Sequence, residues 1–353
     1  MPDFAPFLKS LLSAPGLSGY EAPVAGLIEA EWRPLVDEIS RSRIGSLQAL
    51  KKGNGEGKRP AIMLTAHMDA IGLIVTQIVD GLLRITEMGG IDVRVLPGTP
   101  VNVHSADEVL FGVIVQPSAR ALPASLGDNP VGLDYLFVDI GLSHERAIQK
   151  VKIGDLVSFA TEPVELAGDT ISGHSLDNRA SVVALTIALR ELQGTSHAWD
   201  VWAVATAQEE ENLSGAATSA FGLHPDLAIA VDVTFAKGPG ANDWQTFSLG
   251  KGPTLGFGPN IHPFLYKKLK ELAERLEIPH AAEALPRHSG TDAYALQIAA
   301  EGIPTAVIGI PLRYMHTPVE VVAYKDIQRT GRLIAGFIAA LEVDFMERIV
   351  WEE

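Results

Sequence analysis

The stretch from Trp199 to Glu211 constrains the fold more than any other part of the chain. An apolar run, Trp199 to Ala207, leads into three consecutive glutamates, Glu209, Glu210 and Glu211. The run predicts a buried strand, and burying adjacent carboxylates at its end is unfavourable unless a cation compensates them. Ligands of open α/β sheets bind beyond the carboxyl ends of the strands. By itself the stretch is more typical of a solvated acidic turn, so the rest of the chain must decide between the two.

Three other apolar runs also lead into a histidine or an acid. They are Ala61–Ala66 before His67 and Asp69, Leu227–Val231 before Asp232, and Pro304–Ile310 before the loop that carries His316. A further acid, Asp177, precedes a helical pattern at Ala180–Leu192. A histidine at a strand end, with a carboxylate two residues on, is a common way to present a metal ligand. The pattern therefore favours a functional site at one edge of a sheet.

The middle of the chain differs from both flanks. From Ile71 to about Pro163, short runs rich in Val, Ile and Leu alternate with Gly, Pro and Asp turns, and only Ser143–Val151 has a helical pattern. The strand that ends at His67 precedes this segment, and the other candidate strands follow it. We therefore predict an α/β fold in which a mixed, largely parallel sheet is flanked by helices. Residues 1–69 and 165–353 would form this domain, and residues 70–164 an inserted, small β-barrel-like domain.

The charge and the cysteine content limit the classes of function that the protein can have. Lys and Arg number 28 against 43 Asp and Glu, and the net charge of −15 argues against binding to nucleic acid or to an anionic membrane surface. Since cysteine is absent, any metal must be held by His, Asp and Glu, which suits zinc, cobalt or manganese. No apolar run reaches about 18 residues, and the first residues lack the pattern of a secretory signal. We expect a soluble, cytoplasmic protein.

Five short motifs stand in a fixed order along the chain. They are Ala66–Leu73, Leu176–Arg179, Gln208–Glu210, Ala230–Asp232 and Arg313–Pro318. In order and approximate spacing they resemble the motifs of the M42 metallo-aminopeptidases, the family of tetrahedral or TET aminopeptidases. The resemblance covers essentially the whole chain, because it extends to Leu17–Glu21 and to Phe137–Gly141 in the middle segment. It implies the dinuclear metallopeptidase fold and identifies the inserted domain as the family's dimerisation module.

The resemblance also implies a site with two divalent cations. The implied ligands are His67 and Asp232 for one metal, Glu210 and His316 for the other, and Asp177 as a bridge between them. Glu209 would be the general base, and Asp69 would orient His67. Two cations about 3.5–4 Å apart can hold a water whose pKa falls towards about 7 while they polarise a carbonyl. A base that moves its proton typically contributes about 10²–10⁴ in rate.

Two expectations about the glutamates and their surroundings follow. On an extended backbone, Glu209 and Glu210 would point in opposite directions, so that only one faces the metals, and Glu211 would be solvated or structural. The chain also departs from the family, since Ala70 replaces a common Glu and Asn178 a common Asp. Such changes around a metal site alter affinity or rate by about 10–100-fold. Either of His174 and His288, beside the motifs, could line the substrate pocket, but we favour a polar loop residue for each.

The predicted function is a cytoplasmic aminopeptidase that removes N-terminal residues from short peptides. It would use two divalent ions, Zn²⁺ or Co²⁺, with Mn²⁺ possible, and would assemble as dimers into a homo-oligomer, commonly a dodecamer in this family. A related dinuclear hydrolase acting on acyl-amino acids or C-terminal residues is an alternative. A glucan hydrolase with paired carboxylates is another, although it has no need for the two histidines. A binding protein on the same fold is a third, and the side-chain preference stays open.

Overall fold

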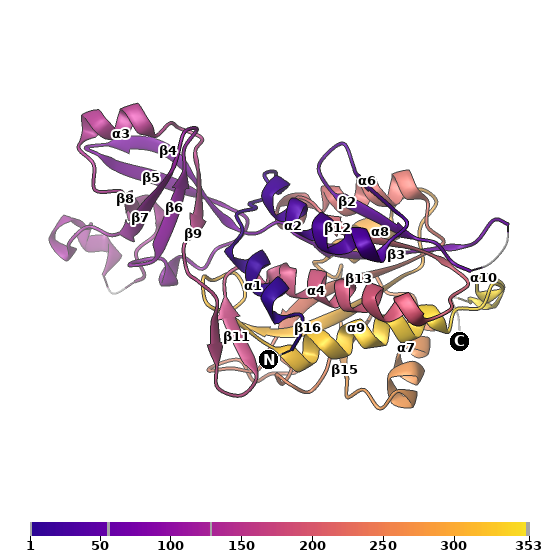
Figure 1. Ribbon diagram of the computed structural model, residues 1–353. Coiled ribbons are helices and arrows are strands. Elements are labelled where there is room, and N and C mark those ends of the chain that lie inside the picture. Colours follow the sequence, from indigo (N-terminus) through magenta and orange to yellow (C-terminus); the bar gives the residue numbers. More distant parts are fainter. Residues whose placement is uncertain (1, 55–56, 128, 351–353) are drawn as a thin grey trace.

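The computed structural model describes residues 2–54, 57–127 and 129–350, which form two separate sheets (Figure 1). The larger sheet has the order β1-β2-β12-β3-β13-β16-β17-β11-β10, with β14 and β15 attached beside β16. The smaller is a closed antiparallel barrel, β4-β5-β8-β7-β6-β9. The predicted fold class, a mixed sheet with helices plus an inserted barrel, is confirmed.

The elements of the larger unit have the following bounds. Its strands are β1 (Glu38–Arg41), β2 (Leu47–Lys51), β3 (Ala61–His67), β10 (Val164–Leu166), β11 (Thr170–Gly173), β12 (Asp200–Thr206), β13 (Leu227–Phe235), β14 (Thr254–Phe257), β15 (Ala281–Ala284), β16 (Thr305–Arg313) and β17 (Glu320–Ala323). Its helices are α1 (Ala5–Ser13), α2 (Ala22–Trp32), α4 (Leu176–Glu191), α5 (Glu209–Asn212), α6 (Ser214–Leu223), α7 (Pro263–Arg275), α8 (Asp292–Gln297), α9 (Tyr324–Ala339) and α10 (Phe345–Arg348). None of the described helices is long and apolar enough to cross a membrane.

Four parallel strands, β12, β3, β13 and β16, form the centre of the larger sheet. Parallel strands are buried on both faces and therefore read as continuous apolar runs, which is why they stand out in the sequence. The helices α1, α2, α4, α7 and α9 pack with the core on one face, and α6 and α8 with that on the other. Because the strands are parallel, their carboxyl ends lie at one edge.

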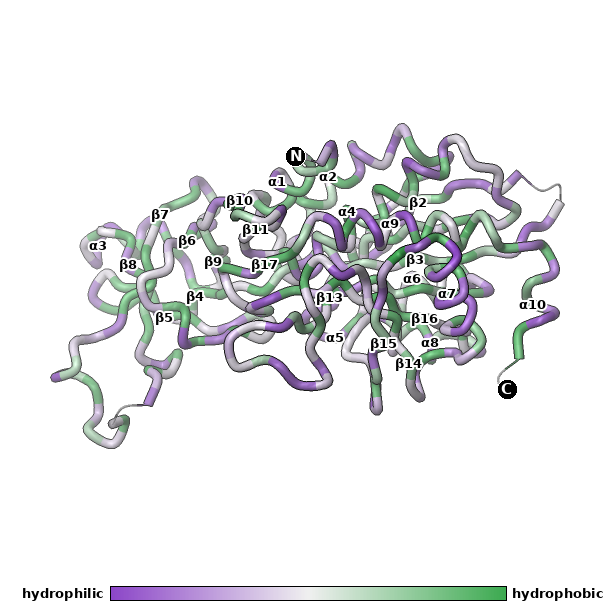
Figure 2. Tube along the Cα trace, turned by 90° about the horizontal axis from the view of Figure 1, so that it is seen from below, coloured by the Kyte–Doolittle hydropathy of each residue, from purple (hydrophilic) through white to green (hydrophobic). Residues whose placement is uncertain are grey.

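The barrel consists of β4 (Gly72–Val79), β5 (Leu82–Met88), β6 (Pro100–His104), β7 (Val109–Val115), β8 (Phe137–Asp139) and β9 (Leu156–Phe159), with α3 (His144–Lys150) beside it. It lies to one side of the larger sheet and has its own apolar core (Figures 1 and 2). Among the described residues, the named strands pair only within their own sheet. This pairing supports the predicted boundaries at residues 70 and 164, which stay a prediction.

Several element boundaries differ from the predicted ones. The strand expected to end before Asp232 continues to Phe235, because β13 and β16 remain paired as far as Phe235 and Leu312. The strands outside the four central ones, β1, β2, β10, β11, β14, β15 and β17, were not predicted, since runs of three to five residues carry weak periodicity.

Candidate active site

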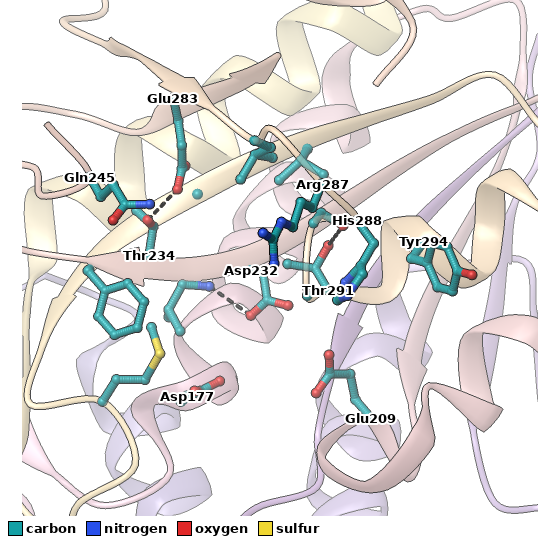
Figure 3. Close-up of a pocket in the computed structure, with 18 of the residues that line it drawn as sticks. Asp177, Glu209, Asp232, Thr234, Gln245, Glu283, Arg287, His288, Thr291 and Tyr294 are labelled. Atoms are coloured by element: carbon teal, nitrogen blue, oxygen red, sulfur yellow. Dashed lines mark hydrogen bonds between the residues drawn. The ribbon is translucent and has the colours of Figure 1, made fainter. Parts of the chain in front are cut away.

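A cleft of about 1100 Å³ opens at the carboxyl edge of the parallel strands. The five candidate metal ligands and the candidate base from the sequence all line this cleft: His67, Asp177, Glu210, Asp232 and His316 as ligands, and Glu209 as the base. Figure 3 shows Asp177, Asp232 and Glu209 facing the same space. Residues spread over some 250 positions of the chain are thus brought together by the sheet, as the family resemblance implied.

His67 is the last residue of β3, and its ring is almost completely buried. Its Nε2 lies 3.1 Å from Asp177 Oδ1, 3.7 Å from Glu209 Oε2 and 3.8 Å from Asp232 Oδ1. Burial opposes a positive charge on the ring, but the nearby carboxylates of Glu209, Asp177 and Asp69 outweigh it and hold the pKa of His67 well above its usual value. The ring therefore sits in a strongly negative field that a cation would relieve.

Asp69 lies behind His67 and is fully buried. Its Oδ1 is 3.5 Å from His67 Nδ1 and accepts a hydrogen bond from the backbone N–H of Glu209 at 3.0 Å. Its Oδ2 accepts from Ser18 Oγ at 2.8 Å and from the backbone N–H of Glu210 at 3.2 Å. Burial works against ionisation, but His67 and these donors lower the pKa of Asp69. Asp69 thus positions both the histidine and the start of α5.

His316 follows β16 and is more exposed. Its Nε2 lies 3.5 Å from Asp177 Oδ2 and 3.7 Å from Glu210 Oε2. Its backbone N–H donates to Glu320 Oε1 at 3.1 Å, and the other oxygen of Glu320 accepts from the backbone N–H of Asp177, also at 3.1 Å. Glu320 is buried, and burial raises its pKa well above the usual value. One carboxyl group therefore ties the His316 loop to the segment that carries Asp177.

Asp177 occupies the centre of the cluster. One carboxylate oxygen faces His67 and the other faces His316. Burial opposes ionisation, yet the two imidazoles together hold the pKa of Asp177 below its usual value. The neighbouring Asn178 donates from Nδ2 to the carbonyl oxygen of Val231 at 2.9 Å, so this segment is also fastened to β13.

The glutamates do not lie on extended backbone, and that prediction is wrong. Gln208 adopts a left-handed conformation, with φ of +59°, and α5 begins directly at Glu209. Because the backbone is helical, Glu209 and Glu210 can both face the cleft, and burial raises the pKa of each well above its usual value. Glu211 also lines the cleft but accepts a hydrogen bond from the backbone N–H of Gly89 at 2.9 Å.

Two residues interpreted as polar loop histidines behave differently from each other. His288 is exposed and lines the cleft, with its ring against Tyr294. His174 is buried, with Nδ1 2.7 Å from Ser175 Oγ, and burial lowers its pKa to about 3. The interpretation of His174 as an ordinary polar loop residue is therefore wrong, since its ring is buried and packs edge-on against Phe159 of β9.

The donor set fits divalent cations. Two groups have ligand atoms within 4.8 Å of one another, His67 with Glu209 and Asp232, and His67 with Asp177 and Glu210. In addition, Glu210 Oε1 is buried without a hydrogen-bond partner. Four buried carboxylates balanced by two imidazoles are stable only if they take up protons or cations. Mixed nitrogen and oxygen donors of this kind suit zinc, cobalt and manganese.

A model of the M42 glutamyl aminopeptidase family matches residues 45–333. The chain belongs to the M42 peptidase family. A lysyl aminopeptidase from Pyrococcus furiosus is 35% identical over 344 residues, which span 96% of this chain and 98% of that protein. The recognition of the family from its five motifs is confirmed, and this M42 protein is a peptide-bond hydrolase.

Solved M42 structures share the whole fold. A TET aminopeptidase from a marine sediment archaeon of the Thaumarchaeota has a TM-score of 0.92 at 30% identity, covering 98% of each chain. A TET1 peptidase from Pyrococcus horikoshii, which can assemble into a tetrahedron or a large octahedral shell, has a TM-score of 0.83 at 32% identity, covering 96% of this chain and all of that one.

Two residues fasten the site in ways that the sequence did not indicate, Arg179 and Glu320. Arg179 is buried and donates to the carbonyl oxygens of Met68 at 3.2 Å, Ala14 at 2.7 Å and Gly16 at 3.3 Å, which holds the N-terminal loop against the end of β3. Burial lowers its pKa to about 10. For Glu320 the only signal was an acid beside an apolar run, Val321 to Ala323.

Proposed function

We propose that this M42 peptidase is an aminopeptidase that releases N-terminal residues from short peptides with the help of two divalent cations. The observation that carries the proposal is the placement of Asp177. Its two oxygens lie 3.1 Å from His67 Nε2 and 3.5 Å from His316 Nε2, so a single carboxylate faces both halves of the site. Such a bridge is what a two-metal hydrolase requires.

Two sets of three protein donors share Asp177. The first set adds His67 and Asp232, and the second adds Glu210 and His316. When bound, a pair of divalent cations supplies Lewis-acid polarisation of the scissile carbonyl and lowers the pKa of an attacking water. Imidazole and carboxylate donors suit Zn²⁺, Co²⁺ and Mn²⁺ alike in ligand type, so metal availability rather than the donor set selects among them.

Among the residues that the five sequence motifs bring to the cleft, Glu209 is the acid that remains once both sets are complete. Three protein donors with an open position are typical of catalytic metal sites. Its carboxylate faces the cleft from the start of α5, and its backbone is held by Asp69. We assign it the role of general base, which takes a proton from the attacking water and passes it to the leaving amine.

The test is hydrolysis of a panel of aminoacyl-anilides and of free and N-acetylated short peptides. The protein is assayed as purified, after chelation, and after addition of Zn²⁺, Co²⁺ or Mn²⁺. We expect single N-terminal residues to be released in a metal-dependent manner, and N-acetylation to abolish the reaction. Cleavage of acetylated substrates instead would favour the alternative hydrolase of acyl-amino acids, and activity that survives chelation would contradict the metal assignment.

We also infer that the barrel carries an interface between copies of the chain. Phe111 and Val109 on β7 and Ile148 and Ile153 near α3 are exposed by 52–71%. The ion pair of Lys150 with Glu108 holds α3 beside the start of β7, and an exposed apolar surface of this kind favours association.

The TET1 relative that forms shells supports the proposal that this chain assembles through dimers into a larger shell. Sedimentation velocity of the purified protein tests this assembly. A shell would admit short peptides, and the cytoplasmic location stays a prediction.

A further inference from the structure

A carboxylate that belongs to neither metal set lies in the wall of the cleft. Glu283 on β15 accepts hydrogen bonds from Thr234 Oγ1 and from Thr254 Oγ1, one at each carboxylate oxygen and both at 2.5 Å. Both threonines are buried, and Glu283 itself is partly buried. Figure 3 shows the Glu283 side chain directed to Thr234, on the opposite wall of the cleft from Asp177 and Glu209.

A glycine leaves the space for this carboxylate. A Cβ at Gly309 would lie 2.3 Å from Thr254 Oγ1 and 3.0 Å from Glu283 Oε2. Gly309 on β16 is the register partner of Asp232 on β13, so the carboxylate is accommodated beside a candidate metal ligand. Any side chain at this position would collide with the buried threonine and displace the acid.

The charge of Glu283 is not compensated by a basic side chain. Its hydrogen-bond donors are two neutral hydroxyl groups, and within the described residues no Lys or Arg lies at ion-pair distance from it. Burial raises the pKa of Glu283, which reflects the unfavourable desolvation of its ionised form. A cation that enters the cleft would therefore gain an ion pair in a partly desolvated place.

Thr234 lies two residues after Asp232 on the same strand and lines the same cleft. Residues two apart on a strand point to the same face and are separated by about 7 Å. The carboxylate of Glu283 accepts a hydrogen bond from the hydroxyl group of Thr234, so it lies beyond Thr234 as seen from Asp232. A lysine side chain, with its ammonium on a four-carbon stem, or an arginine side chain can extend over this distance from a backbone held at the metal site.

We propose that Glu283 selects peptides whose N-terminal residue carries a cationic side chain, lysine or arginine. The inference rests on the aminopeptidase function proposed above, because it names the substrate class of that same cleft. The recognising chemistry is an ion pair between the Glu283 carboxylate and the ammonium or guanidinium group, with Thr234 and Thr254 fixing the orientation of the carboxylate.

Arg287 would favour the opposite substrate preference, for an acidic N-terminal residue. It lines the same cleft, and Figure 3 shows it on the same wall as Glu283. A selector of acidic residues would need this guanidinium. Arg287 is exposed, however, so water screens its charge, whereas Glu283 is partly desolvated and held at both oxygens. The geometry therefore favours the acid as the selecting group.

The experiment compares kcat/KM for lysyl-, arginyl-, leucyl- and glutamyl-anilides in the metal-loaded full chain and in Glu283→Gln. The amide of Gln keeps the shape and can still bond both threonines. We expect the wild type to prefer the two cationic substrates, and the variant to lose on the order of 10- to 100-fold with these, while leucyl hydrolysis changes little. Glu301→Gln, an exposed acid outside the lining of the cleft, changes the net charge equally and should leave the preference intact.

Binding without turnover separates this proposal from the proposed function. Calorimetry with the free amino acids lysine and norleucine, which differ in the terminal ammonium and have no amide bond to hydrolyse, should show tighter binding of lysine to the wild type but not to Glu283→Gln. Leucyl hydrolysis with no preference for lysine would overturn the role of Glu283 and leave the aminopeptidase intact. A preference for glutamyl substrates that Arg287→Gln abolishes would also overturn it. Absence of hydrolysis on the whole panel would count against the proposed function, and calorimetry would then decide the role of Glu283.

Discussion

The two halves of the candidate metal centre are built in different ways. His67, the histidine of the first half, is the last residue of a central strand, and its side chain is 2% exposed. His316, the histidine of the second half, lies in the loop after β16 and is 39% exposed. The first half is held by the sheet and by Asp69, whereas the second depends on contacts with the barrel and on Glu320.

The barrel reaches the second half through the segment Gly89–Asp92. The backbone N–H of Asp92 donates to the carbonyl oxygen of His316 at 3.2 Å, and a Cβ at Gly90 would lie 3.1 Å from His316 Nδ1. His316 itself has a φ of +61°, a conformation that is unfavourable by about 1 kcal/mol or more for a non-glycine residue. One half is therefore preformed by the hydrogen-bonded sheet, while the other is held in place by the inserted barrel.

The largest effect is expected from a change at Glu209. It distinguishes a loss of proton transfer from a loss of metal binding in the half of the site that contains His67. In Glu209→Gln we expect kcat to fall by about 10²–10⁴, because the side chain can no longer take a proton. The metal content, measured by elemental analysis, should stay at two ions per chain.

Glu211→Gln is the matched control for this change, since it neutralises the next-but-one residue of α5 and should lose little activity. A loss of one metal ion in Glu209→Gln would show that this glutamate is a ligand of the His67 half, and the assignment of the base would then fail.

The next effect compares the positioning carboxylates of the two halves. Asp69→Asn and Glu320→Gln each replace an acceptor-only group by an amide that cannot accept at both ends. We expect each to weaken metal affinity by about 10–100-fold. The loss should be larger for Asp69→Asn, because three donors, Ser18 and the N–H groups of Glu209 and Glu210, lose part of their acceptor.

Metal titration with an optical probe such as Co²⁺ measures this difference. The comparison predicts that the His67 site weakens more than the His316 site in Asp69→Asn, and that the order is reversed in Glu320→Gln. Equal weakening of both sites in both variants would mean that the two halves behave as one unit.

The smallest effect tests the contact with the barrel. In Gly90→Ala the added methyl group must displace the His316 ring by a few tenths of an ångström. We expect a several-fold weaker binding of one metal and a similar loss of activity, with a melting temperature close to that of the wild type.

Gly132→Ala in the inserted segment is the control, because a Cβ there meets no atom within 4 Å. If Gly90→Ala leaves metal binding and activity as they are in this control, the barrel does not position His316, and the contrast between the halves would rest on Glu320.

Much of the site was predictable because buried parallel strands can be recognised in the sequence as apolar runs. A strand buried on both faces requires an apolar run, so a polar residue such as His67 or Asp232 at or near its end is conspicuous. The placement of Asp232 inside β13 was not predictable, since strand length is decided by pairing with β16. The helical start at Glu209 was missed for a similar reason, because the donors that fix it bond to Asp69, some 140 residues away.

Local sequence patterns were sufficient to predict the α/β class, the inserted barrel and the set of acids and histidines, because periodicity and short motifs are local properties of the chain. Only the tertiary structure decided how Glu320 joins His316 to Asp177, 143 residues distant from it, and how Gly309 makes room for Glu283. The segments that make these contacts carry no sequence pattern that indicates their partners. They exist because burying a polar group requires a partner, and the fold determines which distant residue provides it.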